Sequence, residues 1–323
     1  MKKKILLKAP LLTRSGYGEQ SRFALRSLRS RSDLFDIYIQ PLTWGETSWI
    51  NDESEERTWI DQTIEKTIHH IQAGGQFDIS LQVSIPNEWA NIAPINIGYT
   101  AGIETTRVSH EWIQLGDQMQ RIVVVSNHSK NIYKNTVYEA HNETTGEKST
   151  ISLQSDVEVV NYPVKTFDDL QPLELNLDYD FNFLCVAQMG PRKNLVNTIK
   201  WFVEEFKGDK EVGLVIKTNS GTNTTIDRKL TSMVMEKLIN EVRDGEYPKI
   251  HMIHGPMTNS QIVSLYRHPN IKALLSLTRG EGYGLPLLEA AACGLPVIAT
   301  NWSGHLDFLK TGKFLKVPYT LQT

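Results

Sequence analysis

Short apolar runs alternate with longer segments of helical periodicity along most of the chain. In the first half the apolar runs are KILLK, FDIYIQ, FDISLQ, INIGYT, RIVVV and VEVV, beginning at residues 4, 35, 77, 95, 121 and 157. Between them lie EQSRFALRSLRS, ESEERTWIDQTIEKTIHHI and HEWIQLGDQM, in which apolar residues recur at helical spacing. Strands that alternate with helices are typical of a parallel sheet covered by helices on both faces.

A second series of the same kind begins at residue 181. Its apolar runs are FNFLCVA, VGLVIKT, KIHMIHG, KALLSLT, PVIAT and KFLKV, beginning at residues 181, 212, 249, 272, 296 and 313. The helical pattern LVNTIKWFVEEF places Leu195, Ile199, Phe202 and Phe206 on one apolar stripe. The acidic interval 164–180 has no clear period, and we interpret it as a linker.

These patterns predict an α/β chain of two Rossmann-like, doubly wound domains that face each other across a cleft. The N-terminal domain covers residues 1–163 and the C-terminal domain residues 181–323. Residues 139–156 are polar and rich in turn formers, so we expect a surface insertion there.

The composition agrees with this reading and excludes several classes of protein. The chain has 323 residues, a net charge of −3, 40% hydrophobic and 22% charged residues, as in ordinary globular proteins. The two cysteines, Cys185 and Cys293, argue for a reducing compartment and against a disulfide scaffold or a cysteine-based zinc site. No apolar run approaches the about 18 residues of a membrane span, and the opening MKKKILLKAPLL reads as a strand rather than a signal peptide. We therefore expect a cytoplasmic protein.

The stretch TRGEGYGLPLLEA, residues 278–290, joins a predicted buried strand to a predicted helix. Pro286 falls in the first turn of that helix and Gly294 just after its end. The amides of Tyr283, Gly284 and Leu285 would then stand at a helix N-terminus beside a strand's carboxyl end, where phosphates bind. The alternative is a plain tight turn, with Glu289 placed only to favour the helix dipole.

Two further corners strengthen the ligand interpretation. In QMGPRKNLVNTI, Arg192 and Lys193 precede a predicted N-cap at Asn194, where cations oppose the helix dipole unless an anion joins them. Lys217 ends the next strand; it either reaches the same edge or is a solvated strand-end lysine. The N-terminal half offers TRSGYGEQS, again between a strand and a helix, which is either a cleft-facing ligand loop or a turn.

The segment SLTRGEGYGLPLLEAAACGLPVIATNWSGHLDFL resembles the signature region of glycosyltransferase family 4 (group 1), whose members have the two-domain GT-B fold. Glu281 and Glu289, separated by seven residues, match the family's paired glutamates. FLCVAQMGPRKNLVNTI resembles the family's basic motif, and SGYGEQSR resembles its N-terminal glycine loop. The resemblance covers most of the chain.

The resemblance implies transfer of a hexosyl or pentosyl group from a nucleotide sugar, UDP- or GDP-linked, with retention and with no metal or other cofactor. The N-terminal domain would hold the acceptor and the C-terminal domain the donor. By that analogy Glu289 binds the donor ribose and the amides of Gly282, Tyr283, Gly284 and Leu285 meet the donor's sugar and diphosphate. Glu281 would hold sugar hydroxyls, and Lys193 with Arg192 would neutralise the leaving diphosphate. From its position at a strand end, and not from the resemblance, Lys217 is a further candidate for donor binding. Gly16 would let the N-terminal loop close over the phosphates.

Three departures from the family pattern bear on activity. Gln188 stands where the family usually has an arginine, and Arg192 could compensate for it. Ser15 replaces the first glycine of the N-terminal loop. The sequence ends at Thr323, before the helices that commonly cross back to the N-terminal domain in the family, which suggests a trimmed chain or an unusual domain closure.

Other residues have weaker signals. Glu104 follows the fourth predicted strand and either contacts the sugar or acceptor, or caps a surface loop. For His110, His128 and His254 we expect ordinary structural roles, because no spacing suggests a metal site. Ser126 is expected to cap a helix at a strand–helix junction.

Basic residues concentrate at the start of the chain. Arg22, Arg26 and Arg29 share one helical face, which is either a solvated face or a surface for an anionic acceptor. Such an acceptor could be a phosphorylated glycan, a lipid at a membrane surface, or DNA as in DNA-modifying sugar transferases. Two other functions stay open: a non-catalytic nucleotide-sugar-binding or partner module, and a nucleotide-sugar epimerase.

Overall fold

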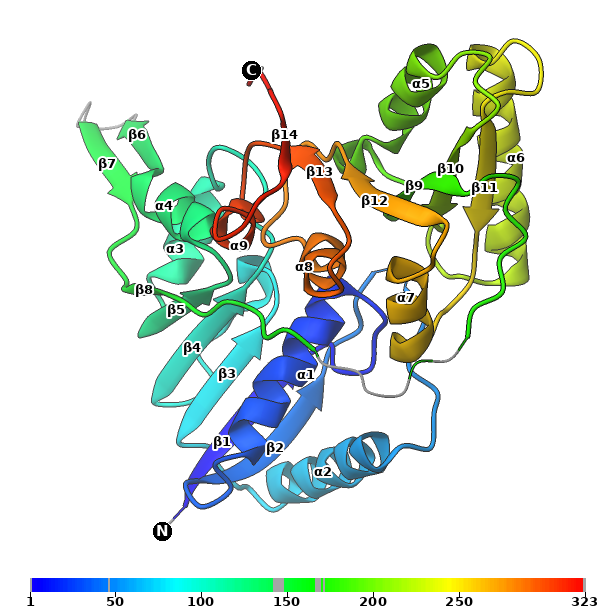
Figure 1. The fold of residues 1–323 in the computed structure, drawn as a ribbon. Helices are drawn as coiled ribbons and strands as arrows, with labels where there is room; N and C mark the ends of the chain where they lie inside the picture. Colours follow the sequence, from blue (N-terminus) through cyan, green and yellow to red (C-terminus); the bar gives the residue numbers. More distant parts are fainter. Residues whose placement is uncertain (1, 46, 142–147, 166–169, 171, 322–323) are drawn as a thin grey trace. The chain divides into compact units, whose positions relative to one another are not determined.

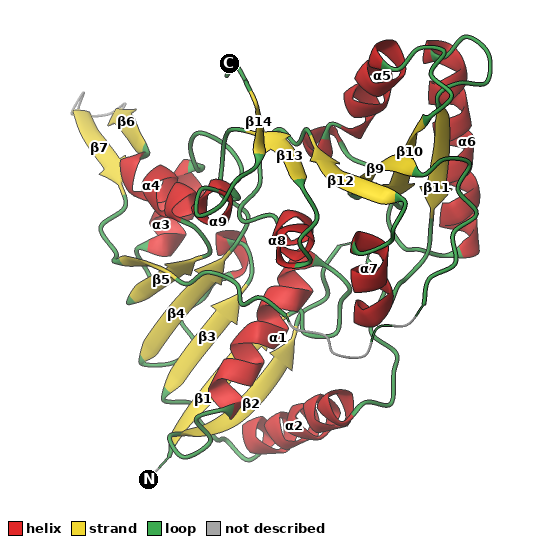
Figure 2. Ribbon diagram, in the orientation of Figure 1, coloured by secondary structure: helices red, strands yellow, loops and turns green. Residues whose placement is uncertain are grey.

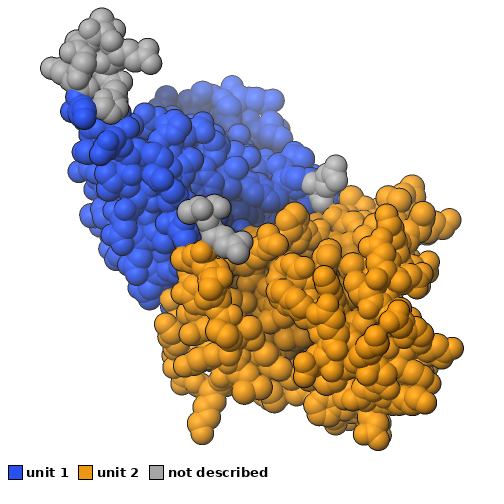
Figure 3. Space-filling view, turned by 90° about the horizontal axis from the view of Figure 1, so that it is seen from above, with its two compact units in different colours: residues 1–163 blue, residues 164–323 orange. Residues whose placement is uncertain are grey.

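The structure is a computed structural model that describes residues 2–45, 47–141, 148–165, 170 and 172–321. The chain divides into two compact units, residues 1–163 and residues 164–323, which are coloured separately in Figure 3. We call them the first and the second unit. No helix among the described residues is long and apolar enough to cross a membrane.

The first unit is built on a six-stranded parallel sheet with strand order β2-β1-β3-β4-β5-β8 (Figure 1). Its strands are β1 (Lys3–Ala9), β2 (Phe35–Pro41), β3 (Ile79–Val83), β4 (Ile95–Thr100), β5 (Arg121–Val124) and β8 (Val157–Val159). Its α-helices are α1 (Gly16–Arg29), α2 (Glu55–Gln72), α3 (His110–Gly116) and α4 (Asn127–Asn135). All six apolar runs of the first half form these strands, as predicted.

The first unit places its core on both faces of the sheet. Helix α1 contacts β1, β2 and β3, and α2 contacts β2. A separate apolar cluster under α3 and α4 includes Ile113, Ile122 and Tyr133, each 0% exposed. Ser126 caps α4, because its Oγ accepts a hydrogen bond from the Ser129 amide at 3.1 Å, as expected.

The predicted insertion at residues 139–156 contains more regular structure than its polar composition suggested. Strands β6 (Val137–His141) and β7 (Lys148–Ser152) pair in an antiparallel hairpin. The predicted insertion also includes residues 142–147, which lie outside the described part of the chain. Leu153, just after the hairpin, packs into the α3–α4 cluster. Tertiary packing therefore overrides weak strand propensity at this place.

The second unit has a six-stranded parallel sheet with strand order β11-β10-β9-β12-β13-β14. Its strands are β9 (Phe181–Val186), β10 (Val212–Lys217), β11 (Lys249–Ile253), β12 (Ile271–Ser276), β13 (Val297–Thr300) and β14 (Leu315–Val317). Its α-helices are α5 (Leu195–Glu205), α6 (Thr225–Val242), α7 (Asn259–Tyr266), α8 (Leu285–Ala292) and α9 (Leu306–Leu309). Written by order along the chain this is 3-2-1-4-5-6, the Rossmann order, whose switch point lies between β9 and β12.

Helices cover both faces of this sheet (Figure 2). Strand residues alternate between two cores: Leu184 and Val215 pack with α7 and α8, whereas Cys185 and Leu214 pack with α5 and α6. The predicted stripe of α5 is confirmed, since Leu195, Ile199 and Phe202 are at most 4% exposed and Phe206 packs against the same cluster. Because both faces are buried, the strands read as apolar runs without strict alternation.

The interval interpreted as a linker contributes to the second unit. Leu173, Leu175 and Leu177 are partly buried against the core that contains α7 and α8. Residues 166–169 and 171 of that interval lie outside the described part of the chain. The leucines stand at every second position, so one side of this extended segment can pack on the domain.

Candidate active site

The switch point of the second unit brings two loops together. The loop after β9 holds a short 3₁₀ turn, Pro191–Lys193, and the loop after β12 holds the glycine-rich corner. The Arg279 amide donates to the Arg192 carbonyl at 2.9 Å, and Asn194 Nδ2 donates to the Leu277 carbonyl at 3.0 Å. These bonds join residues more than 80 positions apart, and they build one site from two distant motifs.

Asn194 begins α5, as predicted, but its side chain does not cap the helix. The residue lies in the left-handed region with φ 56°, and its side-chain amide reaches across to the other loop. Asn194 therefore couples the two loops instead of closing its own helix. Gln188, which occupies the family's arginine position, donates to the Ser220 carbonyl at 3.3 Å.

Glu281 is the centre of a buried charge cluster. Its Oε1 lies 2.5 Å from Lys193 Nζ, and its Oε2 lies 3.1 Å from Arg192 Nη1. The glutamate is 5% exposed, while the side chains of Lys193 and Arg192 are 19% and 38% exposed. The two cations therefore stand between a buried carboxylate and solvent, where an incoming anion could meet them.

Two opposing effects act on the pKa of Glu281. Burial, the largest effect, raises the pKa, but Lys193 and then Arg192 lower it, and the net shift is downward. Glu281 is thus a carboxylate at neutral pH. Arg192 also donates to the Gly280 carbonyl at 2.8 Å, which fixes the guanidinium against the glycine corner.

The glycine corner has the geometry that the sequence predicts. Gly284 precedes α8 with φ +93°, Pro286 is in the first turn, and Gly294 follows the helix with φ +78°. Among the described residues, no hydrogen bond occupies the amides of Gly282, Gly284 or Leu285. These amides belong to the start of a helix, where the partial positive charge favours an anion.

Glu289 lies in the second turn of α8, so the alternative role in the first turn is wrong. Its Oε2 accepts a hydrogen bond from Tyr266 Oη at 3.1 Å, and Tyr266 is 1% exposed. The sequence analysis did not single out Tyr266, because nothing in the sequence links a tyrosine of α7 to a carboxylate of α8.

Lys217 ends β10 and is partly buried, and burial lowers its pKa. Among the described residues, the Lys217 side chain forms no ion pair and no hydrogen bond with Glu281, whose cationic partners are Arg192 and Lys193. The structure thus brings together Arg192, Lys193, Glu281 and the residues 282–285.

A third loop, which the sequence reading did not single out, supports the corner from behind. It follows β13 and contains Ser303, Gly304 and His305, of which Ser303 and His305 are 4% and 0% exposed. The Glu281 amide donates to Ser303 Oγ at 2.9 Å, and the Gly304 amide donates to the Glu281 carbonyl at 2.9 Å. Only tertiary contacts reveal this loop, although it lies inside the quoted signature segment.

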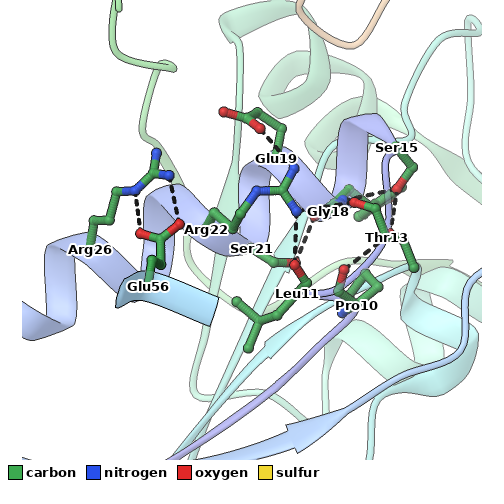
Figure 4. Close-up of polar contacts among 11 residues, drawn as sticks. Pro10, Leu11, Thr13, Ser15, Gly18, Glu19, Ser21, Arg22, Arg26 and Glu56 are labelled. Carbon is green, nitrogen blue, oxygen red and sulfur yellow. Dashed lines mark hydrogen bonds and ion pairs between the residues drawn. The ribbon is translucent and has the colours of Figure 1, made fainter. Parts of the chain in front are cut away.

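In the first unit, the glycine loop leads from β1 into α1. Ser15 caps α1, with its Oγ accepting from the Gly18 amide at 3.0 Å (Figure 4). A Cβ atom on Gly18 would lie 2.0 Å from the Thr13 carbonyl oxygen, whereas a Cβ on Gly16 would meet nothing within 4 Å. Close packing therefore requires glycine at 18, and Gly16 has open space around it.

Both interpretations of the arginine face are wrong for Arg22, as Figure 4 shows. Arg22 is 8% exposed, and its Nη1 donates to the carbonyls of Leu11 at 2.8 Å and Thr13 at 3.0 Å. Arg26 forms two 2.7 Å hydrogen bonds with Glu56 of α2, and the guanidinium carbon of Arg29 lies 4.5 Å from the Trp59 ring centroid. Arg22 thus holds the loop after β1 in place, and Arg26 and Arg29 contact α2, although the Arg26 side chain is still 46% exposed.

Glu104 follows β4 in the first unit and acts electrostatically on Tyr17. Burial is the main cause that raises the pKa of Tyr17 to about 12, and Glu104 adds to the rise. His254 pairs with Asp227 at 3.0 Å, a structural role as expected. In the described part of the chain no group of three or more His, Cys, Asp or Glu residues could hold a metal ion.

Comparison with known proteins agrees with this geometry. Residues 174–322, nearly the whole second unit, match the family described as Glycosyl transferases group 1. A probable sucrose-phosphate synthase of Thermosipho melanesiensis is 27% identical over 144 residues, covering 42% of this chain and 31% of that protein. The mannosyltransferase WbdA of Escherichia coli is 31% identical over 117 residues, covering 36% of this chain and 13% of that protein. The chain thus spans less than a third of either relative.

The similarity of fold extends over both units. The crystal structure of HepE from Anabaena, determined with UDP-glucose, superimposes with a TM-score of 0.59 at 11% identity, covering 98% of this chain and 85% of HepE. The chain therefore has the GT-B type of fold with two Rossmann-like units, which confirms the predicted fold class.

Proposed function

We propose that the protein is a glycosyltransferase that takes a hexosyl or pentosyl group from a UDP- or GDP-linked sugar and transfers it to an acceptor still to be identified. One observation carries the proposal: a carboxylate and two cations, Glu281, Lys193 and Arg192, meet at the switch point beside the unbonded amides of a helix start. A site of this kind suits a diphosphate leaving group attached to a sugar. The match of the second unit to group 1 glycosyltransferases supports the same reaction.

The reaction breaks the bond between the anomeric carbon and a diphosphate oxygen. An acceptor oxygen forms the new bond to that carbon and loses its proton. Lys193 and Arg192 would neutralise the charge that develops on the diphosphate, the electrostatic effect that usually contributes most to such catalysis. We propose a retaining, metal-independent reaction, in which these cations take the place of a metal.

The remaining assignments follow from position. The amides of Gly282, Tyr283, Gly284 and Leu285 would meet the sugar and diphosphate. Beyond its bonds to Lys193, Arg192 and Thr278, the Glu281 carboxylate keeps a lone pair for a sugar hydroxyl.

Glu289, oriented by Tyr266, would accept from the ribose hydroxyls, and Lys217 would be a further cation for the donor. From the first unit, Gly16 would leave room for the phosphates and Glu104 would contact the sugar or acceptor.

Nucleotide binding is the first test. Each of UDP, GDP, ADP and CDP is added in a thermal-shift measurement, with and without EDTA. A ligand at 100 times its Kd stabilises the folded state by about 2.7 kcal/mol, and we expect this for one nucleotide irrespective of chelator. No shift with any nucleotide would overturn the proposal.

Turnover is the second test, measured as release of the nucleoside diphosphate from the matching nucleotide sugar. Glycan, lipid-linked and DNA acceptors are compared with hydrolysis as the background. Glu281→Gln and Lys193→Ala should each reduce kcat by about 100-fold or more, because Lys193 acts on the charge that develops in the transition state and Glu281 holds both the sugar and that cation in place. Nucleotide binding should change far less.

A second function is favoured by one observation. Gln188 replaces the expected arginine and is bonded to the Ser220 carbonyl, so one cation of the usual set is missing. A non-catalytic module that binds nucleotide sugars would show the thermal shift without any turnover. Gln188→Arg would then be expected to leave turnover at zero, whereas in an enzyme it should change kcat.

A further inference from the structure

Ser303 has an unusual backbone for a residue with a side chain. Its φ is +88°, in the left-handed region that favours glycine, and the residue is 4% exposed. A non-glycine residue is held in this region only when surrounding contacts determine it, and such residues gather at functional sites. The contacts of Ser303 therefore show what the strained backbone achieves.

The Ser303 hydroxyl stands in a short chain of hydrogen bonds. Its oxygen accepts from the Glu281 amide at 2.9 Å, and it lies 3.4 Å from His305 Nδ1. His305 Nε2 lies 2.7 Å from the Thr300 carbonyl oxygen. A carbonyl can only accept, so Nε2 carries the proton and Nδ1 is the acceptor for the Ser303 hydroxyl in the neutral ring.

Gly304 binds the other main-chain group of Glu281. Its amide donates to the Glu281 carbonyl at 2.9 Å, so Glu281 is bound through both its N–H and its C=O. A Cβ atom on Gly304 would lie 1.9 Å from the Gly282 carbonyl oxygen, and no side chain fits there. The loop after β13 is thus pressed directly against the main chain of the glycine corner.

The surroundings keep His305 neutral. The ring is 0% exposed, and burial is the main cause that lowers the pKa of His305. The charged groups that act on it are Glu281, which raises the pKa, and Lys193, which lowers it. A neutral ring keeps the hydrogen-bond direction from Ser303 to His305 unchanged around pH 7.

We propose that Ser303 and His305 are positioning residues for Glu281. They fix the Glu281 main chain and thereby direct its carboxylate to Lys193 and Arg192. This inference rests on the proposed function for its effect on turnover, but the geometry of Glu281 can be tested without substrate. Neither residue is assigned a contact with the donor.

The central variant is Ser303→Gly, which removes the hydroxyl and also relieves the positive φ. Ser303→Ala removes the hydroxyl and keeps the strain. Thr67→Ala is the matched control, because the buried Thr67 Oγ1 likewise accepts a main-chain N–H, from Ile39 at 2.8 Å, but in the first unit. Comparison of the three separates loss of stability from loss of positioning.

The readout without substrate is the acetylation rate of Lys193 by acetic anhydride, followed by mass spectrometry and normalised to exposed Lys237. Loosening of Glu281 weakens its ion pair with Lys193 and makes the Lys193 side chain more accessible to the reagent. Ser303→Gly and Ser303→Ala should therefore raise the Lys193 rate by about 3-fold or more, in line with the modest strength of ion pairs that solvent can reach. Thr67→Ala should leave it unchanged. An unchanged rate in both Ser303 variants would overturn the inference.

The readout with substrate is the turnover of the nucleotide sugar that the wild type hydrolyses or transfers. Ser303→Gly should lower kcat by about 10- to 100-fold, because small displacements of catalytic groups cost this much, with KM changed less. His305→Asn keeps an acceptor for the Ser303 hydroxyl and should retain more kcat than His305→Leu. Wild-type kcat in Ser303→Gly would refute the inference.

The two readouts also separate this inference from the proposed function. A wild type without turnover or nucleotide binding would refute the function, while the acetylation result would still decide whether Ser303 positions Glu281.

Discussion

Replacing Lys193 by methionine tests the reasoning about the buried charge cluster independently of any substrate. The change removes the ammonium but keeps a long apolar side chain. Glu281 is then a buried carboxylate, its side chain 7% exposed, with Arg192 at 3.1 Å as its remaining cation. Removing one partner of a buried pair costs about 3–5 kcal/mol when the other charge is left alone. Because Arg192 stays, we expect a smaller loss, about 2–3 kcal/mol at pH 7.

The expected loss is large enough for calorimetry. One kcal/mol shifts the melting temperature of a unit of this size by about 2–4 °C, so the second unit should melt roughly 5–10 °C lower. The control is Lys237→Met on α6, whose 3.9 Å pair with Glu241 joins side chains 79% and 60% exposed. Such surface pairs contribute at most about 0.5 kcal/mol, so the control should melt like the wild type.

The change with pH in the stability loss of Lys193→Met is a second test of the charge cluster. In the wild type the pKa of Glu281 is lowered, so its contribution to stability is present above the unfolded-state pKa and is lost as pH falls through the lower folded-state pKa. Without Lys193, burial acts with less opposition and the folded-state pKa rises. The folded variant then takes up a proton more readily than the unfolded chain, and the penalty should shrink between pH 7 and pH 5.

Glu281→Gln completes a double-mutant cycle with Lys193→Met. The two changes together should cost less than the sum of the single changes, with a coupling of about 1–3 kcal/mol expected for residues in one network. A Lys193→Met protein that melts like the wild type at pH 7, or a penalty that grows at pH 5, would refute the account of the cluster.

Three further predictions concern other contacts. Tyr266→Phe removes the hydrogen bond to Glu289 while keeping the buried ring. It should weaken binding of the nucleotide found by thermal shift about 5- to 10-fold, measured by calorimetric titration. Unchanged affinity would contradict the role of Glu289. Gly18→Ala should destabilise the first unit by about 1–3 kcal/mol in urea denaturation, because its Cβ would meet a main-chain oxygen. Gly16→Ala should be tolerated, and equal stability of the two variants would be evidence against this packing. Arg22→Met should lower the free energy of unfolding by about 2–3 kcal/mol in the same assay, because it leaves buried carbonyls unpaired. The loss should persist in 1 M salt, and its disappearance in salt would instead support a surface role for Arg22.

Much of the fold could be predicted because its signals are local. Each apolar run of the second half became one strand between β9 and β14, and the apolar stripe of α5 faces the core. The corner at Gly284 could also be anticipated, since a helix start with a nearby proline and a left-handed glycine depends on adjacent residues only.

The partners within the site could not be predicted in the same way. Asn194 was expected to cap its own helix, but its side chain reaches Leu277. The hydrogen bond of Tyr266 could not be predicted, because the sequence around a buried tyrosine does not indicate which carboxylate its hydroxyl contacts. Ser303 was hidden because a positive φ at serine is imposed by packing and is not preferred by the residue itself.

The sequence by itself determined the strands of the two parallel sheets, their order along the chain, and the residue types available at each strand end. Hydrophobic periodicity carries this information because residues on the buried side of a helix or strand recur at the spacing of that element. Only the tertiary structure decided that Lys193 and Glu281, 88 positions apart, share a buried ion pair, and that the arginines of α1 serve α2 and the loop after β1. Helical spacing places Arg22 and Arg26 on one face of α1. Whether each side chain is buried or exposed depends on the segments that pack against that face, and the tertiary structure decides which segments these are.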